Sequence, residues 1–197
     1  MKRVLWWIPG TTLQADSSDA QQVHSQFQGL FLAGGVTLSQ VSSITGLEPH
    51  VIQNWVKRGF LTPPQKKRYS MSQLCRIIHI NMLRAVLPLE QICKLLTYIN
   101  GDLSDHSDDL IDDAQLYFLF VRLAAAHRKM HDPKGRDAYL EELLLEYEEP
   151  VPGAKERIAQ VLQVMLTAWA AALMCRQAEE MMHKLQISSE KTANCGN

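Results

Sequence analysis

Gly46 and Pro49, placed between two short apolar-periodic segments, constrain this chain more than any other feature. Thr37 can act as an N-cap before residues 38–44, whose apolar positions share one helical face, and Gly46 stands where that helix must end in a left-handed residue. Pro49 suits the first turn of a second helix, since its missing N–H would be unpaired there anyway. The sequence therefore predicts two short helices joined by a turn of about three or four residues, which is the helix-turn-helix pattern.

The second predicted helix, residues 49–58, carries polar residues suited to the major groove of DNA. His50, Gln53 and Asn54 would lie in its exposed N-terminal half. Gln and Asn can form two hydrogen bonds with an adenine edge, and His can donate to a guanine acceptor or a phosphate. The alternative is an ordinary solvated polar face.

A short basic connection follows the second helix. Gly59 ends that helix and two prolines prevent its continuation, so the Lys-Lys-Arg run at 66–68 falls in a tight connection before Tyr69. This arrangement predicts a short wing whose cations contact phosphates. A solvated loop is the alternative.

Basic residues are concentrated in one part of the chain. Residues 36–100 contain eight Lys or Arg and two Glu, a net charge of +6, whereas the remainder contains 12 basic and 19 acidic residues, a net charge of −7. The total net charge of −1 is therefore the sum of a basic module and an acidic remainder. The basic module has the electrostatic character of a nucleic-acid binder.

These motifs resemble the DNA-binding domain of the MerR family. The similar elements are TLSQVSSITG, Trp55 with Gly59-Phe60-Leu61, a wing ending at Tyr69, and MSQLCRIIHINMLRA followed by LPLEQICKLL. In finer detail, VIQNWVKRGFLTPPQKKRYSMSQL resembles a bacterial family, domain of unknown function 1836, and the resemblance covers about residues 20–125. It implies a helical, DNA-binding regulatory protein, although the closer family has no assigned activity to carry over.

The chain departs from the MerR pattern in two places. Gln53-Asn54-Trp55 stands where the family usually has Arg-Tyr-Tyr, so base preference does not transfer. The wing lacks the usual Gly-Tyr-Arg element and has Lys67 where that Arg would fall, a change that phosphate contact tolerates better than bidentate geometry does. The predicted DNA-binding residues are Thr37, Ser39, His50, Gln53, Asn54, Lys57, Arg58, Lys66, Lys67, Arg68 and Tyr69.

The predicted fold class is all-α: a MerR-like, winged helix-turn-helix domain with a C-terminal helical bundle. We expect an N-terminal arm at 1–20, the DNA-binding domain at 21–101, a helical dimerisation or effector region at 102–187 and a disordered tail at 188–197. The arm's apolar run VLWWIPG is too short for a signal peptide, and we expect it to pack on another helix or subunit. TTLQADSSDAQQ is predicted as a polar loop. Four cysteines without a C-x-x-C pair indicate a reduced cytoplasm.

Three further helices are predicted, at 110–130, 136–149 and 154–185. The run DLSDHSDDLIDD lacks the Gly and terminal Glu of an EF-hand, so helix caps and first-turn acids explain it better than calcium or magnesium. His127 and His131 could share a helical face and a metal, but without a third ligand a surface pair is the preferred interpretation. We therefore predict no metal and no cofactor.

The last predicted helix contains VMLTAWAAALMC, the most apolar stretch of the chain. Its twelve residues fall short of the roughly 20 needed to span a bilayer, so we expect burial and no membrane association. Small residues at 168 and 170–172 allow another helix to approach closely, and we expect a homodimer through this helix, with a purely intramolecular bundle as the alternative. Its methionines could suit an effector pocket, although they fill core gaps more commonly.

An enzyme is not expected, because the sequence has no G-x-S-x-G, no phosphate-binding glycine loop and no H-E-x-x-H. We expect a cytoplasmic, sequence-specific regulator of transcription that binds double-stranded DNA as a homodimer; any small-molecule effector is left open. The alternative is a protein-interaction module, in which the helix-turn-helix scaffold has lost DNA and the acidic C-terminal helices bind a partner.

Overall fold

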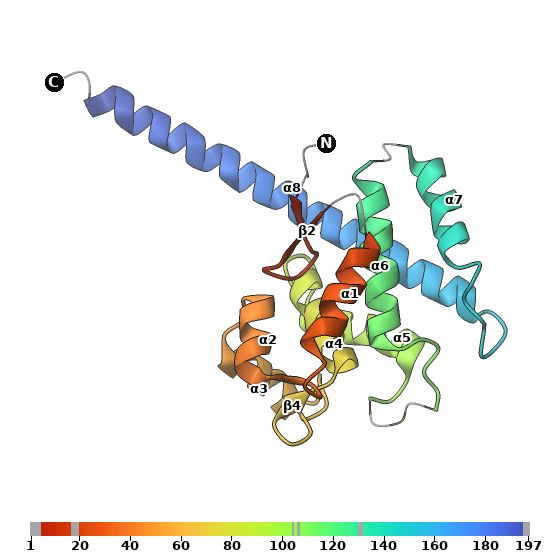
Figure 1. Cartoon of the computed structure of the whole chain (residues 1–197). Helices are drawn as coiled ribbons and strands as arrows, with labels where there is room; N and C mark the ends of the chain where they lie inside the picture. The colour runs from red at the N-terminus through yellow and green to blue at the C-terminus, as the bar shows by residue number, and fades with distance from the viewer. Residues whose placement is uncertain (1–4, 17–19, 104, 106, 130–131, 195–197) are drawn as a thin grey trace.

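The computed structural model describes residues 5–16, 20–103, 105, 107–129 and 132–194, and this part of the chain is predominantly helical (Figure 1). Its helices are α1 (Ala20–Leu30), α2 (Leu38–Thr45), α3 (Pro49–Lys57), α4 (Met71–Leu83), α5 (Leu89–Asn100), α6 (Asp113–His127), α7 (Pro133–Leu143) and α8 (Ala154–Asn194). Two antiparallel strand pairs accompany them: β1 (Leu5–Trp7) with β2 (Gln14–Asp16), and β3 (Val36–Thr37) with β4 (Arg68–Tyr69).

Local sequence signals explain where the helices of the N-terminal half begin and end. Thr37 caps α2, since its hydroxyl accepts from the backbone N–H of Gln40 while the Gln40 side chain accepts from the backbone N–H of Thr37. Gly46 follows α2 with φ 70°, the left-handed conformation that the sequence predicted. Ser70 and Gln73 form the same reciprocal cap at the start of α4.

The β1–β2 hairpin was not predicted, because its polar second half was expected to be a loop. Trp6, Ile8 and Ala15 of this hairpin are buried. The hairpin lies on helices of its own chain: β2 contacts α1, and the Tyr117 hydroxyl of α6 donates to the carbonyl of Pro9 at 2.8 Å. The N-terminal arm thus packs on helices of its own chain, and the fold is predominantly helical, with short strand pairs that were not predicted.

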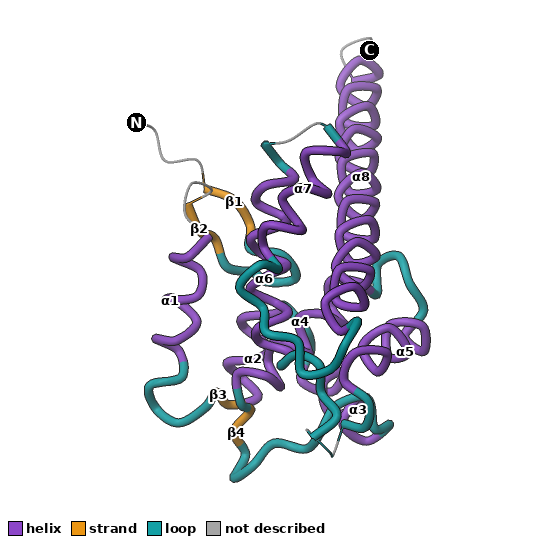
Figure 2. Tube along the Cα trace, turned by 90° about the vertical axis from the view of Figure 1, so that its right-hand side faces the viewer, coloured by secondary structure: helices purple, strands orange, loops and turns teal. Residues whose placement is uncertain are grey.

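Helix α4 lies at the centre of the molecule (Figure 2). Its residues from Leu74 to Ile80 are buried, and it packs against α2, α5, α6 and α8. Helix α6 also packs on α1, α7 and α8. The apolar core is therefore continuous across residues 101–102, the predicted boundary between the DNA-binding domain and the C-terminal region.

A buried charged cluster joins α4 to α6. Arg76 Nη1 lies 3.2 Å from Asp113 Oδ2, and His79 Nδ1 lies 3.6 Å from Asp113 Oδ1. Burial acts to raise the pKa of Asp113, but the neighbouring His79 and Arg76 outweigh it, and the pKa is lowered. Asp112 caps α6 by accepting from the N–H of Ala114. The last two aspartates of the acidic run thus serve as a cap and an ion-pair partner.

The C-terminal helices differ in extent from the sequence prediction. Helix α6 is shorter than the predicted 110–130, and α7 begins three residues before position 136 and ends at Leu143, after which the chain turns. The predicted His127–His131 pair cannot be described because His131 lies outside the described residues. Helix α8 continues past Leu185 to Asn194, and its C-terminal half extends beyond the rest of the molecule (Figures 1 and 2).

By length and composition alone, the 154–185 part of α8 is long and apolar enough to cross a membrane, although the sequence prediction considered only its twelve most apolar residues. Of the 18 most apolar consecutive residues in this segment, 44% are buried inside the molecule. Core helices of water-soluble proteins share this property, so the composition alone does not assign a membrane span.

Candidate nucleic-acid interface

Helix α3 buries one face and exposes the other. Ile52 and Trp55 are buried, whereas four polar side chains spaced along the opposite side are exposed. The connection from α2 is only Gly46, Leu47 and Glu48, and Pro49 occupies the first turn as predicted. The exposed stripe consists of His50, Gln53, Asn54 and Lys57.

The predicted wing is a tight hairpin. Strand β4 pairs with β3 directly before α2, and at the tip the N–H of Arg68 donates to the carbonyl of Gln65 at 2.8 Å. The two residues between them, Lys66 and Lys67, have φ values of 47° and 60°, and both are exposed. Positive φ at both central positions is the geometry of a type I′ turn, which normally selects Asn and Gly. The sequence carries neither, so the turn type could not be predicted.

The base of the wing is fixed by Gln73 at the start of α4. Its amide nitrogen lies 3.1 Å from the carbonyl of Thr62, 2.9 Å from the hydroxyl of Thr62 and 3.1 Å from the carbonyl of Pro63. Gln73 therefore anchors the loop that leads into the wing. Gln73 was not among the residues predicted from the sequence, although it stands at the last position of an S-x-x-Q capping motif.

Two of the predicted DNA-binding residues stabilise the wing through contacts within the chain. Tyr69 is only 3% exposed, and burial raises the pKa of its phenol, so its ring serves the core and is not available to DNA. Arg68 stays exposed, but its Nη1 donates to the carbonyl of Gly35 at 2.8 Å and ties the hairpin to the segment before β3. The two free-standing cations of the wing tip are thus Lys66 and Lys67.

Two more of the predicted DNA-binding residues, Arg58 and Thr37, use their side chains in contacts within the chain. Arg58 Nη2 lies 3.2 Å from Glu90 Oε1, and the guanidinium stacks 4.6 Å from the ring centroid of Phe60. The hydroxyl of Thr37 is used in the α2 cap, while Ser39 is exposed on the first turn. Arg76, counted in the basic module, is buried in the ion pair with Asp113 and adds nothing to the surface.

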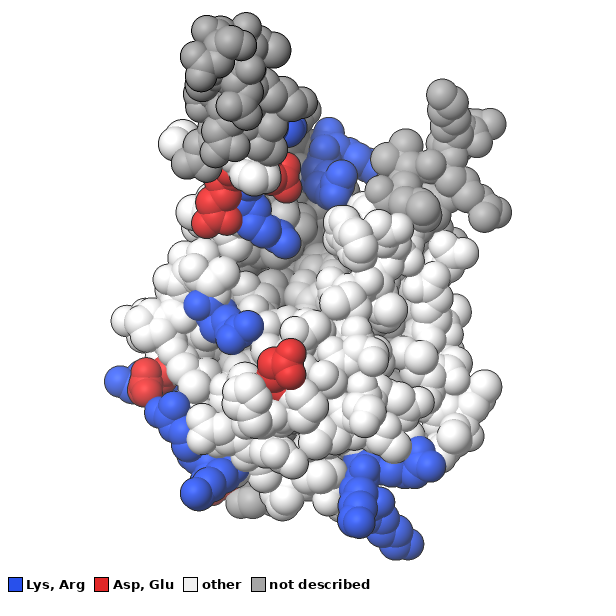
Figure 3. All heavy atoms as spheres, turned by 90° about the vertical axis from the view of Figure 1, so that its left-hand side faces the viewer, with Lys and Arg blue, Asp and Glu red and all other residues white. Residues whose placement is uncertain are grey.

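Several exposed basic side chains lie at one end of the molecule, and others lie higher on the same face (Figure 3). Figure 3 shows Lys and Arg along the lower end, where α2, α3 and the wing lie, with few carboxylates among them. The structure therefore brings together on one end the polar stripe of α3 and the two lysines of the wing, which are distant in sequence.

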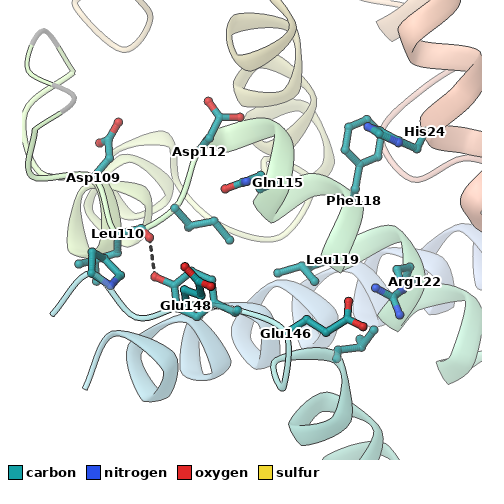
Figure 4. Close-up of a pocket in the computed structure, with 14 residues that line it drawn as sticks. His24, Asp109, Leu110, Asp112, Gln115, Phe118, Leu119, Arg122, Glu146 and Glu148 are labelled. Carbon is teal, nitrogen blue, oxygen red and sulfur yellow. Dashed lines mark hydrogen bonds between the residues drawn. The ribbon is translucent and has the colours of Figure 1, made fainter. Parts of the chain in front are cut away.

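A separate hollow of about 830 Å³ lies between α1, α6 and the segment 143–150 (Figure 4). Apolar side chains such as Leu119 and Phe118 line it, and Asp109, Glu146 and Glu148 stand around it. The Tyr147 hydroxyl donates to the carbonyl of Leu110 and holds the 143–150 segment against the start of α6. No predicted DNA-binding residue lies in this hollow.

Comparison with known proteins supports the predicted resemblance to domain of unknown function 1836. Residues 30–120 match the family described as a domain of unknown function, DUF1836. The chain is 28% identical over 112 residues to the uncharacterized protein YkrK of Bacillus subtilis (strain 168), a match covering 55% of this chain. The match spans 48% of YkrK, about half its length. No solved structure matches the chain significantly.

Proposed function

We propose that this chain is a sequence-specific DNA-binding regulator of transcription, built on a MerR-like winged helix-turn-helix and acting in the cytoplasm as a homodimer. Helix α3 would enter the major groove, and the β3–β4 wing would contact the phosphate backbone. The support comes from the geometry of α3 and the wing, since the related proteins carry no assigned activity.

The main support for this proposal is the backbone conformation of the two lysines at the wing tip. Lys66 and Lys67 hold left-handed backbone conformations that cost non-glycine residues about 1–2 kcal/mol each. Asn and Gly would relieve that cost, and the lysine side chains make no compensating hydrogen bond or ion pair within the described residues. Strain of this kind is commonest at functional positions, and two exposed cations on a rigid hairpin suit phosphate oxygens.

The exposed stripe of α3 supplies the reading element. His50 lies in the first turn, while Gln53 and Asn54 follow one turn later on the same outward side. N-terminal residues of a recognition helix are the ones that reach base edges. Lys57, in the last turn of α3, would contact a flanking phosphate.

Helix α8 provides the dimer contact in this proposal. Its exposed side carries a stripe at alternating spacings of three and four residues, the heptad spacing of paired helices: Val164, Thr167, Ala171, Met174, Ala178, Met181 and Leu185. Met174 is 71% exposed and Leu185 is 65% exposed. Pairing of this stripe with a second α8 would remove this apolar surface from water and supply the two heads that specific binding needs.

The test is in vitro selection of DNA fragments from the source genome at near-physiological salt. The wild-type chain is compared with a Lys66→Gln, Lys67→Gln variant, and with Lys129→Gln as a matched control away from the interface. We expect a recurring, roughly palindromic site that the control retains and the wing variant loses. Absence of enrichment with the wild-type chain would overturn the proposal.

The second candidate is a protein-interaction module that does not bind DNA. The exposed apolar side chains of distal α8 favour it, because a partner helix could cover the same stripe. It predicts an interaction that depends on Met174 and Met181 and is insensitive to the wing lysines, which separates it from DNA binding.

A further inference from the structure

A cavity of about 520 Å³ lies where the N-terminal hairpin, α4 and α8 meet. One wall is the segment from Trp7 to Thr11, and the opposite wall is a face of α8 formed by Trp169, Leu173 and Arg176. Its volume is within the range of cavities that hold small organic ligands. It lies apart from the candidate DNA contacts, none of which lines it.

The cavity combines two guanidinium groups with two indoles. Arg128 comes from the residue after α6 and Arg176 from α8, and both are exposed. Within the described residues neither forms an ion pair. The guanidinium carbon of Arg128 lies 5.7 Å from the ring centroid of Trp6, which holds this cation against a buried indole.

Trp7 provides accessible apolar surface in the same cavity as these cations. Trp169 is buried in the cavity wall, while Trp7 is 60% exposed, an unusual position for a large aromatic ring. Only one carboxylate, Glu180, lines the cavity with them. Guanidinium groups suit the oxygens of a carboxylate or phosphate, and the exposed indole of Trp7 suits an aromatic ring.

The walls connect the candidate DNA-binding head to α8. Asn81 Nδ2 donates to the carbonyl of Gly10 at 3.1 Å and to that of Thr45 at 2.9 Å. The N–H of Thr12 donates to the carbonyl of Ile44 at 2.8 Å. The hairpin wall is thus fixed to the end of α2, whereas the other wall belongs to the helix proposed to pair in the dimer.

We propose that this cavity binds a small anion that carries a flat aromatic ring, held by Arg128 and Arg176 and stacked on the exposed indole of Trp7. A ligand bound there contacts both α8 and the hairpin that is fixed to α2, so ligand binding changes the affinity for DNA. This effect on DNA affinity rests on the proposed function, whereas ligand binding itself does not. Any such coupling is reciprocal, because DNA must then change the affinity for the ligand by the same factor.

The binding test is isothermal titration calorimetry of the full chain with three probes. These are 1-naphthoate, adenosine 5′-monophosphate and the cation 1-naphthylmethylammonium. We expect at least one anion to bind and the cation not to bind. Binding of 1-naphthoate alone identifies a carboxylate ligand, and binding of the nucleotide alone identifies a phosphate ligand. Failure of both anions at millimolar concentration, or equal binding of the cation, overturns the proposal.

Variants place the bound anion in the cavity. Arg128→Gln with Arg176→Gln should weaken binding by about tenfold or more, the loss expected when charge-assisted hydrogen bonds are removed. Trp7→Ala should also weaken it, whereas Lys129→Gln, next to Arg128 but outside the cavity, should not. All four side chains are exposed, so folding should be unaffected. Unchanged affinity in the arginine and Trp7 variants would place the ligand elsewhere and overturn the assignment.

The coupling is tested by measuring DNA affinity with and without the anion that binds. A shift of severalfold that disappears in the double arginine variant supports regulation. If the anion binds but the DNA affinity is unchanged, the proposed ligand site is supported and the proposed effect on DNA affinity is wrong. If the chain binds no DNA, the proposed function and the coupling fail together, while the calorimetry still decides the site.

Discussion

Arg76 Nη1 lies 3.2 Å from Asp113 Oδ2, and this buried ion pair joins the central helix α4 to the start of α6. Arg76 Nε also lies 3.3 Å from the carbonyl of Phe60, directly before the wing loop. One side chain thus connects the C-terminal helices to the end of the α2–α3 unit. The ion pair therefore links the basic module, residues 36–100, to the acidic C-terminal part of the chain.

Replacing Asp113 with Asn should lower the free energy of unfolding by about 3–5 kcal/mol at pH 7, because it leaves the buried guanidinium uncompensated. The pKa of Asp113 is lowered in the folded state. Its stabilisation is therefore complete above the pKa of an unfolded Asp, about 3.9, and is lost as pH falls through the lower folded value. Urea unfolding at several pH values should show the wild-type and variant converging in acid.

An Arg76→Met, Asp113→Leu double variant provides the control for this ion pair. Replacing both charges with apolar groups of similar size is often nearly neutral, so its stability should lie well above that of Asp113→Asn. A double variant as unstable as the single one would show that packing around residue 113, rather than an unpaired charge, causes the loss.

Gly10→Ala should destabilise the chain by about 2 kcal/mol or more. Gly10 has φ 72°, and a Cβ there would lie 2.8 Å from Ile78 Cγ2 and 2.9 Å from the Ile78 carbonyl oxygen on α4. Gly29→Ala is the matched control, because a Cβ at this helical position meets nothing within 4 Å. It should raise the melting temperature slightly; equal effects of the two substitutions would contradict the close approach at Gly10.

Lys66→Asn with Lys67→Gly should raise the free energy of unfolding by about 1 kcal/mol, because both residues suit the type I′ turn. Valine at both positions should lower it, since β-branched residues are outliers at positive φ. Thermal unfolding of the three proteins checks this order. If the Asn-Gly variant is more stable but has lost DNA affinity, the lysines are maintained for binding at the expense of stability.

Met181→Glu should dissociate the proposed dimer, because it places a charge in the apolar stripe of α8. His183→Glu, on the same helix but outside the stripe, should not. Sedimentation equilibrium over a range of concentrations measures both. A wild-type chain that stays monomeric throughout, or equal behaviour of the two variants, would argue against pairing through this stripe.

The sequence predicted the α2–α3 unit well because its signals are local. Thr37, Gly46 and Pro49 each act through the backbone of their own turn, so the positions of these helix ends followed from residue type. The wing was predicted as a connection, but its turn type was hidden because Lys66 and Lys67 are not residues that favour positive φ.

Contacts between distant segments could not be predicted from local patterns. The burial of Tyr69, the Arg68–Gly35 hydrogen bond and the Arg58–Glu90 pair all depend on tertiary packing, and they change which of the predicted residues are available at the surface. The β1–β2 hairpin was missed for the same reason, since its apolar side is defined by α1 and α6, to which it packs.

The salt dependence of DNA affinity tests the central claim most directly. On a selected site, the logarithm of the association constant should fall linearly with the logarithm of salt concentration, and Lys66→Gln with Lys67→Gln should reduce the slope by about 1.8, the value for two lost phosphate contacts. Lys129→Gln should leave the slope unchanged. An affinity that does not depend on salt, or an unchanged slope in the wing variant, would contradict phosphate contact by the wing.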